Sequence, residues 1–251
     1  MKKDDIILKI RDLNKTFGTQ HVLKGVNLNI PRGQITVIIG GSGCGKSVLL
    51  KHLIGLMRPD FGKILIDEVD IFSLESDALT NIRMRFGMLF QDAALFDSMN
   101  SFENVAFPVR EHRPKMPENQ VKALVAEKLK QVGLPNVEKK MPSDLSGGMR
   151  KRVGLARAIV LNPEIILYDE PTTGLDPVMS RAIDDLIVST HDHVGATTII
   201  ISHDIRATLR IANKVAMLHD GRIVAEGTPD ELQHSKDPIV SNFLEPSLVG
   251  R

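Results

Sequence analysis

The sequence is poor in the residues that mark several functional classes. Its 251 residues include no tryptophan, one tyrosine and one cysteine, and its formal net charge is only +1. A lone cysteine cannot form an intramolecular disulfide, which argues against a disulfide-held secreted scaffold and favours a reducing compartment. A near-neutral chain with few aromatic side chains lacks the basic surface and stacking platforms of nucleic-acid-binding proteins. We therefore expect no nucleic-acid partner.

Long hydrophobic runs are also missing. Nowhere do about 18 apolar residues follow one another, so we expect no membrane-spanning helix. Residues 1–5 are polar apart from Met1 and are followed by only Ile6, Ile7 and Leu8, which is too short for the apolar region of a signal peptide. We expect a cytoplasmic protein whose length fits one large domain or two closely associated ones.

The order of apolar segments predicts a parallel α/β core. Short apolar runs alternate with segments of helical periodicity, which is typical of a sheet that is buried on both faces. The runs lie at residues 35–39, 64–66, 86–90, 165–168, 198–201 and 215–218. Two strands at 6–11 and 22–30, with no helix between them, predict an antiparallel sheet. From residue 101 to 159 no strand-like run appears and apolar residues recur at helical spacing, so a helical insertion is expected.

A glycine-rich segment predicts a nucleotide site. Residues 40–47 read GGSGCGKS and match the pattern G-x-x-x-x-G-K-[ST] between a predicted strand and a predicted helix. Glycines allow the backbone N–H groups to curl around phosphate at a helix N-terminus. Lys46 would reach the β- and γ-phosphates, and Ser47 would bind Mg²⁺. We interpret Cys44 as a small loop residue and not as a catalytic thiol.

A second motif supplies acidic side chains. The apolar run at 165–168 ends in Asp169 and Glu170, which resembles a Walker B motif. Asp169 would hold Mg²⁺ through water, and Glu170 would polarise an attacking water as a general base. The two motifs together predict a site that binds a nucleotide with Mg²⁺ and hydrolyses it.

The segment LSGGM at residues 145–149 opens a predicted helix, and with it the chain resembles the ABC ATPases. The resemblance implies that Ser146, Gly147 and Gly148 bind the γ-phosphate of an ATP held by the glycine-rich loop of a second copy. Two copies would therefore enclose two ATP molecules. Met149 stands where the family usually has glutamine, which leaves the expected phosphate contacts unaltered.

The resemblance also assigns further roles. It implies that Phe17 stacks on adenine, that Gln91 senses Mg²⁺ and water, and that His203 bridges the γ-phosphate and Glu170. Asp176 would lie in the D-loop at the dimer interface and contribute to the nucleotide site. The implied Mg²⁺ ligands are Ser47, Gln91 and Asp169, and the implied ATP contacts of the first loop are Gly40, Gly41, Ser42, Gly43, Cys44, Gly45, Lys46, Ser47 and Val48.

The same resemblance implies one ABC ATPase domain over residues 1–251. We expect a P-loop NTPase (RecA-like) core with an antiparallel β subdomain at about 1–91 and 160–228. An α-helical ABC subdomain would occupy about 92–159, and a C-terminal extension would follow at about 229–251. Residues 237–244 would form a short amphipathic helix that reaches the second copy.

Three segments indicate a branch of the family. Residues 87–112, 145–152 and 172–180 are similar to the ATPases of the Mla (maintenance of lipid asymmetry) and MCE-associated phospholipid transporters. This implies a peripheral subunit on the cytoplasmic face of the inner membrane that powers phospholipid transport between bacterial membranes. The implied partners are an MlaE-type permease, a hexameric MCE-domain protein (MlaD-type) and a small STAS-domain protein (MlaB-type). Residues 91–112 would receive a helix of the permease.

Three alternatives stay open. The first is the ATPase of an importer for another small solute, which has the same motifs but not the similarity over 91–112. The second is an ABC ATPase that acts on nucleic acid, which the short distance between Gln91 and Ser146 disfavours because it leaves no room for a long coiled coil. The third is a subunit that binds nucleotide without hydrolysing it, which the intact Lys46, Asp169, Glu170 and His203 disfavour.

Overall fold

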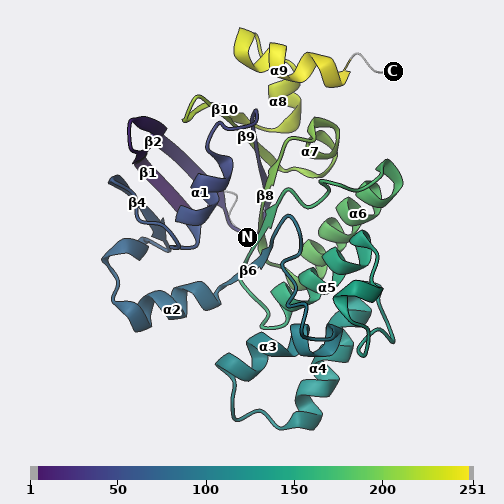
Figure 1. Ribbon diagram of the computed structural model, residues 1–251. Helices are drawn as coiled ribbons and strands as arrows, with labels where there is room; N and C mark the ends of the chain where they lie inside the picture. Colours follow the sequence, from purple (N-terminus) through teal and green to yellow (C-terminus); the bar gives the residue numbers. More distant parts are fainter. Residues whose placement is uncertain (1–4, 249–251) are drawn as a thin grey trace. The chain divides into compact units, whose positions relative to one another are not determined.

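The computed structural model describes residues 5–248, which form two compact units (Figure 1). The discontinuous unit combines Met1–Arg83 with Thr197–Arg251, and the central unit is Met84–Ala196. Helix α2 (Ser76–Met84) lies at the sequence boundary between them and buries none of its residues. Within residues 5–248, no helix combines the length and the apolar character that crossing a bilayer requires.

The discontinuous unit holds an antiparallel sheet of order β2-β1-β4-β5. Its long hairpin, β1 (Ile6–Phe17) and β2 (Gln20–Pro31), is continued by β4 (Phe61–Ile66) and the short β5 (Val69–Asp70). The predicted antiparallel sheet is thus present, but it also contains residues 64–66, which the apolar pattern wrongly assigned to the parallel core. Burial alternates along β4, as in a strand with one covered face. Both hairpin strands are longer than their apolar runs because the outer half is polar and is stabilised by cross-strand hydrogen bonds.

Parallel strands form the second sheet of the discontinuous unit. Strand β3 (Ile35–Ile39) pairs in parallel with β8 (Thr197–Ser202) and with β9 (Lys214–His219). Strand β10 (Arg222–Gly227) adds an antiparallel edge. Every residue of β3 and β8 is buried, as expected for strands covered on both faces. The helices of this unit are α1 (Lys46–Leu53), the 3₁₀ turn Ile71–Ser73, α7 (Ile205–Ile211), α8 (Pro229–Gln233) and α9 (Pro238–Leu248).

The central unit is mostly helical, as the sequence predicts. Its two strands, β6 (Phe86–Leu89) and β7 (Ile165–Asp169), pair in parallel. Figure 1 shows its helices in teal and green. They are α3 (Ser101–His112), α4 (Glu118–Gln131), the 3₁₀ turn Pro142–Asp144, α5 (Gly147–Ile159) and α6 (Pro177–Val194). Parallel strands, an antiparallel sheet and a helical segment together confirm the expected mixed α/β class.

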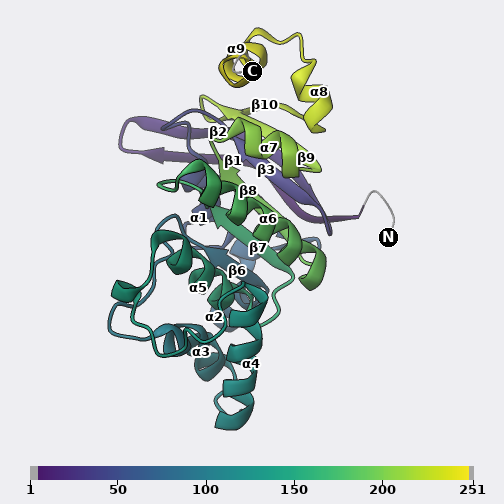
Figure 2. The ribbon, with the colours of Figure 1, turned by 90° about the vertical axis from the view of Figure 1, so that its right-hand side faces the viewer.

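The C-terminal helix α9 is only partly covered. It lies next to α8 in both ribbon views (Figures 1 and 2). Val240 and Leu244 are buried within the chain, whereas Ile239 remains 40% exposed and Phe243 is half-buried. The sequence predicts that residues 237–244 reach a second copy, with packing against their own chain as the alternative. Val240 and Leu244 pack against their own chain, because helical spacing turns them to the same side. Contact of this helix with a second copy stays a prediction.

Candidate functional site

The glycine-rich loop at residues 40–47 leads from β3 into α1, as the motif requires. Two of its glycines are needed for steric reasons. A Cβ on Gly40 would lie 2.2 Å from the carbonyl oxygen of Leu218, so a side chain has no room there. Gly45 caps α1 with φ of 106°, a left-handed conformation that L side chains rarely adopt. Glycine at these positions lets the loop close tightly against β9 and turn into the helix.

Lys46 is the first residue of α1, and its ammonium lies within the loop. The side chain is 6% exposed, and Nζ donates hydrogen bonds of 2.9 Å to the carbonyl oxygens of Gly40 and Gly41. A Cβ on Gly41 or Gly43 would meet no atom within 4 Å, so space is open beside the loop backbone. A cation, open backbone and a helix N-terminus in one place fit a phosphate group. Ser47 follows with an exposed hydroxyl, and Val48 is half-buried.

Cys44 occupies the middle of this loop and is half-buried. Burial raises the pKa of its thiol, and the positive charge of Lys46 lowers that pKa by a smaller amount. Burial disfavours the thiolate, which is the nucleophilic form of cysteine. This direction favours the predicted role of Cys44 as a loop residue, which stays a prediction.

Two further predicted residues belong to the same unit. Phe17 ends β1 and is 43% exposed, with the Nζ of Lys15 lying 5.6 Å from the centroid of its ring. His203 directly follows β8 and is exposed. The next residue, Asp204, caps α7 by accepting a hydrogen bond from the backbone N–H of Ala207, and so fixes the chain just after the histidine.

In the central unit, the two acidic residues stand at the end of β7. Asp169 is its last residue, and Glu170 adopts a left-handed φ of 45°. The hydroxyl of Thr173 donates a hydrogen bond of 2.9 Å to Oε2 of Glu170, and the backbone N–H of Thr173 donates to the Glu170 carbonyl at 3.2 Å. A non-glycine residue in this conformation carries strain, which the surrounding contacts must offset. Thr173 supplies two of those contacts and orients the carboxylate.

Residues 145–149 (LSGGM), the signature segment, lead into α5. Ser146 is the N-cap residue, and its hydroxyl accepts a hydrogen bond of 3.3 Å from the backbone N–H of Met149. Gly147 and Gly148 form the first turn, where backbone N–H groups have no partner within the helix. A Cβ on Gly148 would lie 2.5 Å from the end of the Met179 side chain. The turn is a helix N-terminus at which backbone N–H groups and a hydroxyl come together.

Asp176 and Gln91 complete the set in the central unit. Asp176 caps α6 and accepts hydrogen bonds of 3.0 Å from the backbone N–H groups of Val178 and Met179. Its carboxylate thus has a structural partner in its own chain. Gln91 is exposed shortly after β6. The segment beyond it is fixed by Arg157, which donates to the carbonyl oxygens of Ala93 and Ala94 at 2.8 Å.

The predicted residues therefore form two local groups. The discontinuous unit holds Phe17, the loop 40–48 and His203, and the central unit holds Gln91, residues 146–148, Asp169, Glu170 and Asp176. Two residues were missed from the sequence: Lys151, which donates to the carbonyl oxygens of Pro171 and Thr173, and Thr173, which donates to the Glu170 carboxylate. One available signal was a lysine on the buried face of α5, at helical spacing from Gly148 and Leu155.

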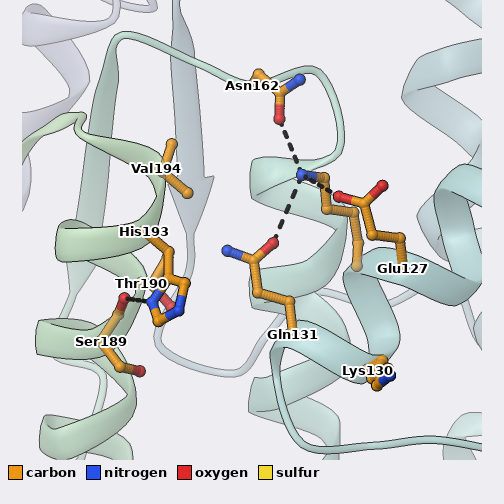
Figure 3. Close-up of a pocket in the computed structure, with 9 residues that line it drawn as sticks. Glu127, Lys130, Gln131, Asn162, Ser189, Thr190, His193 and Val194 are labelled. Carbon is orange, nitrogen blue, oxygen red and sulfur yellow. Dashed lines mark hydrogen bonds and ion pairs between the residues drawn. The ribbon is translucent and has the colours of Figure 1, made fainter.

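A separate hollow of about 560 Å³ lies between α4 and α6 in the central unit (Figure 3). Its lining includes none of the predicted site residues. The buried ammonium of Lys128 donates to Oδ1 of Asn162 at 2.9 Å and forms an ion pair of 3.2 Å with Glu127. These contacts are made by side chains at the wall of the hollow, and they join α4 to the turn before β7.

Comparison with known proteins places these features in a family. The model of the ABC transporter family matches residues 23–173. The chain is 45% identical over 245 residues to the probable ribonucleotide transport ATP-binding protein mkl of Mycobacterium leprae, covering 98% of this chain and 70% of that protein. It is 42% identical over 244 residues to the intermembrane phospholipid transport system ATP-binding protein MlaF of Haemophilus influenzae, covering 97% and 92%.

A solved structure shows the same fold. The chain matches the dimeric post-hydrolysis state of the ATP-binding cassette MJ0796 bound to ADP and Pi, with a TM-score of 0.80 and 33% identity. The match covers 88% of this chain and 98% of that one. The fold expected from the sequence, a P-loop NTPase core with antiparallel β and helical ABC subdomains, is thereby confirmed.

Proposed function

The chain belongs to the ABC transporter family of ATP hydrolases, and on that premise we propose that it powers the movement of phospholipid between membranes as the ATPase subunit of a transporter. One observation carries the ATPase part of the proposal. Lys46 places a buried ammonium between two carbonyl oxygens of a glycine loop whose backbone is open beside it. This arrangement suits the β- and γ-phosphates of ATP.

The discontinuous unit binds the nucleotide. The backbone N–H groups of residues 40–48 and the ammonium of Lys46 hold the phosphates, and the exposed ring of Phe17 stacks on adenine. His203 contacts the γ-phosphate. Ser47 and Asp169 offer oxygen ligands, which Mg²⁺ prefers, and Gln91 adds an amide oxygen. When bound, Mg²⁺ would neutralise charge that develops on the phosphates.

Glu170 acts as the general base. Its carboxylate is oriented by the Thr173 hydroxyl, and it accepts a proton from the water that attacks the γ-phosphorus. The bond between the β–γ bridging oxygen and the γ-phosphorus breaks, which leaves ADP and phosphate. The protein's part is to orient the water and to hold charge in fixed positions, and such positioning supplies most of the catalysis in phosphoryl transfer.

Two copies of the chain enclose two ATP molecules. Ser146, Gly147 and Gly148 of one copy bind the γ-phosphate held by Lys46 of the other, and Asp176 lies near that interface. The dimeric state of the similar cassette MJ0796 supports this arrangement. The helix start at α5 also supports it, because it offers N–H groups and a hydroxyl to an anion.

The cargo and the partners rest on similarity. Relatives of nearly equal identity bear different names, one for ribonucleotide and one for phospholipid transport. The similarity over residues 87–112 favours phospholipid. The proposed assembly adds an MlaE-type permease, an MlaD-type MCE-domain protein and an MlaB-type STAS-domain protein, at the cytoplasmic face of the inner membrane. We also retain the predicted division into a core and β subdomain at about 1–91 and 160–228, a helical subdomain at about 92–159 and a C-terminal extension.

Reconstitution tests the proposed function. The chain is purified from membranes with its partner chains and placed in vesicles that contain a labelled phospholipid. ATP-dependent transfer of the lipid to acceptor vesicles that carry the MCE-domain protein is the expected result, and Glu170→Gln should abolish it. Transport of a labelled ribonucleoside, with no lipid transfer, would instead support the ribonucleotide alternative. If the purified wild-type chain bound no ATP, the proposed ATPase function itself would be wrong.

The permease contact is proposed at the segment after Gln91. Phe96 is 42% exposed although its ring lies 5.0 Å from that of Phe107 and 5.7 Å from the guanidinium of Arg157. Asn104 further holds the backbone of Phe96 through hydrogen bonds at 2.9 and 3.1 Å. A rigid, exposed aromatic residue is a common anchor in interfaces. Phe96→Glu should leave the ATPase folded yet prevent its retention by the permease, and retained binding would place the contact elsewhere.

A further inference from the structure

Lys151 is a buried cation in the helix that begins with the signature segment. Its side chain is 5% exposed, on the same face of α5 as Gly148 and Leu155. Nζ donates hydrogen bonds of 2.6 Å to the carbonyl oxygen of Pro171 and of 2.7 Å to that of Thr173. A buried ammonium is costly unless it is hydrogen-bonded, so these two contacts fix both the lysine and the segment that it holds.

Residues 170–173, to which Lys151 donates, begin with the proposed general base, Glu170. Pro171 directly follows Glu170, and Thr173 donates its hydroxyl to the Glu170 carboxylate. Glu170 itself is in a left-handed conformation that its neighbours must maintain. The lysine therefore holds the backbone on which the position of the carboxylate depends.

The charges around Lys151 come from two other motifs. Burial lowers the pKa of Lys151, and the negative charges of Asp92 and Glu170 raise it by smaller amounts. Asp92 is the neighbour of Gln91 in the sequence. The ammonium thus interacts electrostatically with the segment after β6 and with the end of β7, while its backbone belongs to the signature helix. The two hydrogen bonds to Pro171 and Thr173 remain its direct contacts.

We propose that Lys151 is a positioning residue for ATP hydrolysis, which holds residues 170–173 so that the Glu170 carboxylate points at the attacking water. This inference rests on the proposed ATPase activity. Movement of α5 with the signature segment would move the lysine and, through its two hydrogen bonds, the segment after Glu170. Contact between Ser146 and the phosphate of a second copy would in this way be reported to the general base of the same chain.

The chain supplies a matched control. Lys128 is also 5% exposed and also lies in the central unit, but its ammonium contacts Asn162, Gln131 and Glu127 at the hollow between α4 and α6 (Figure 3). None of these residues is part of the proposed nucleotide site. Replacing either lysine by methionine removes a buried ammonium, so both variants should lose stability. Only the Lys151 variant should lose catalysis.

The first test compares steady-state kinetics of the full chain. At a temperature where all variants are folded, Lys151→Met should lower kcat about 100-fold, since small misplacements of a catalytic group have effects of that order. KM for ATP should stay within about twofold. Lys128→Met should leave both constants near wild type, and Lys151→Arg should recover part of kcat because arginine can donate to both carbonyls. If Lys151→Met does not fold, Lys151→Gln, which keeps one donor group, replaces it with a smaller expected loss.

The second test needs no turnover. Hydrogen exchange of the backbone N–H groups of Thr173 and Leu175, which donate to Glu170 and Thr172, measures how firmly the segment is held. Exchange should accelerate at least tenfold in Lys151→Met and stay unchanged in Lys128→Met. Equal exchange and equal kcat in the two variants would overturn the inference while leaving the ATPase proposal intact. A wild type without ATPase activity would defeat the ATPase proposal, and the exchange data would still decide whether Lys151 holds the segment.

Discussion

Two helix N-termini of this chain are proposed to bind phosphate, and they are built differently. Helix α1 begins after Gly45, which has no side chain to cap it, whereas α5 begins after Ser146, whose hydroxyl accepts from the backbone N–H of Met149. At α1 the lysine at the helix start folds back into its own loop. At α5 Lys151 instead points to the carbonyl oxygens of Pro171 and Thr173.

The difference predicts a division of labour. A helix terminus alone contributes about 0.3–1 kcal/mol to an anion's binding, whereas a hydrogen bond to a charged group contributes about 1.5–3 kcal/mol. The loop with Lys46 combines both terms and should bind ATP by itself. The turn at Ser146 offers a hydroxyl and backbone N–H groups but no lysine ammonium, so it should affect the reaction only when another copy presents a phosphate already bound. Changes in the first region should alter affinity, and changes in the second should alter rate.

Among changes at the two helix starts, Ser146→Arg has the largest expected effect, which is on the rate. The long side chain would fill the space that a phosphate needs at the start of α5, and loss of such stabilisation costs about 10²–10³-fold in hydrolysis. ATP affinity of the isolated chain should stay at the wild-type value. Ser143→Arg, at an exposed position in the preceding 3₁₀ turn, is the control and should retain activity. An affinity loss as large as the rate loss would contradict the division of labour.

A smaller effect, on affinity, is expected from Lys46→Ala. Removing charged hydrogen bonds worth about 1.5–3 kcal/mol should weaken ATP binding about 10- to 150-fold in a titration calorimeter. Lys51→Ala removes an exposed lysine of the same helix and should change affinity little. If both variants bound ATP equally well, the Lys46 ammonium would have no special role.

Mixing these variants tests whether the two regions act across a dimer. A dimer of one Lys46→Ala chain and one Ser146→Arg chain has one composite site with both wild-type halves and one with neither. Its hydrolysis rate should therefore exceed that of either variant alone, by a margin that grows with the fraction of mixed dimers. Activity no better than that of the separate variants would argue that Lys46 and Ser146 of the same chain work together.

Most of the architecture follows from short-range patterns. Strands β3 and β7 were predicted because each is a nearly continuous apolar run, and burial is what determines their position. Strand β10 and helix α2 were not predicted. Neither contains a buried residue, and β10 is held at the sheet edge by its hydrogen bonds to β9.

The candidate site likewise contains parts that the sequence predicts and one part that it does not. The loop 40–47, the acidic pair after β7 and the turn at Ser146 could be recognised because each motif is contiguous in sequence and lies at the end of one element. The role of Lys151 depends on the path of α5 past the segment after Glu170, whereas Thr173 contacts Glu170 within that segment. That path is a tertiary feature, so the sequence could signal a lysine on a buried face but could not name its partners.

The smallest expected effect is on the alkylation of Cys44 in the glycine-rich loop. Burial raises the pKa of Cys44, so at neutral pH the fraction of reactive thiolate is lower than in a free cysteine, and alkylation by iodoacetamide should be slower. Lys46 opposes that shift, hence Lys46→Ala should raise the pKa further and move the midpoint of the pH–rate profile upward. Cys44 is the only cysteine of the chain, so the mass added by alkylation, followed by mass spectrometry, measures the reaction of this thiol.

The midpoint and the plateau of that profile report different properties. A change in the exposure of Cys44 alters the limiting rate at high pH, whereas a change in charge alters the pH at which half of that rate is reached. Lys51→Ala, on the same helix but exposed, should move neither. A midpoint that falls in Lys46→Ala would mean that the ammonium does not stabilise negative charge in the loop, and the difference drawn between the two helix starts would then lose its electrostatic basis.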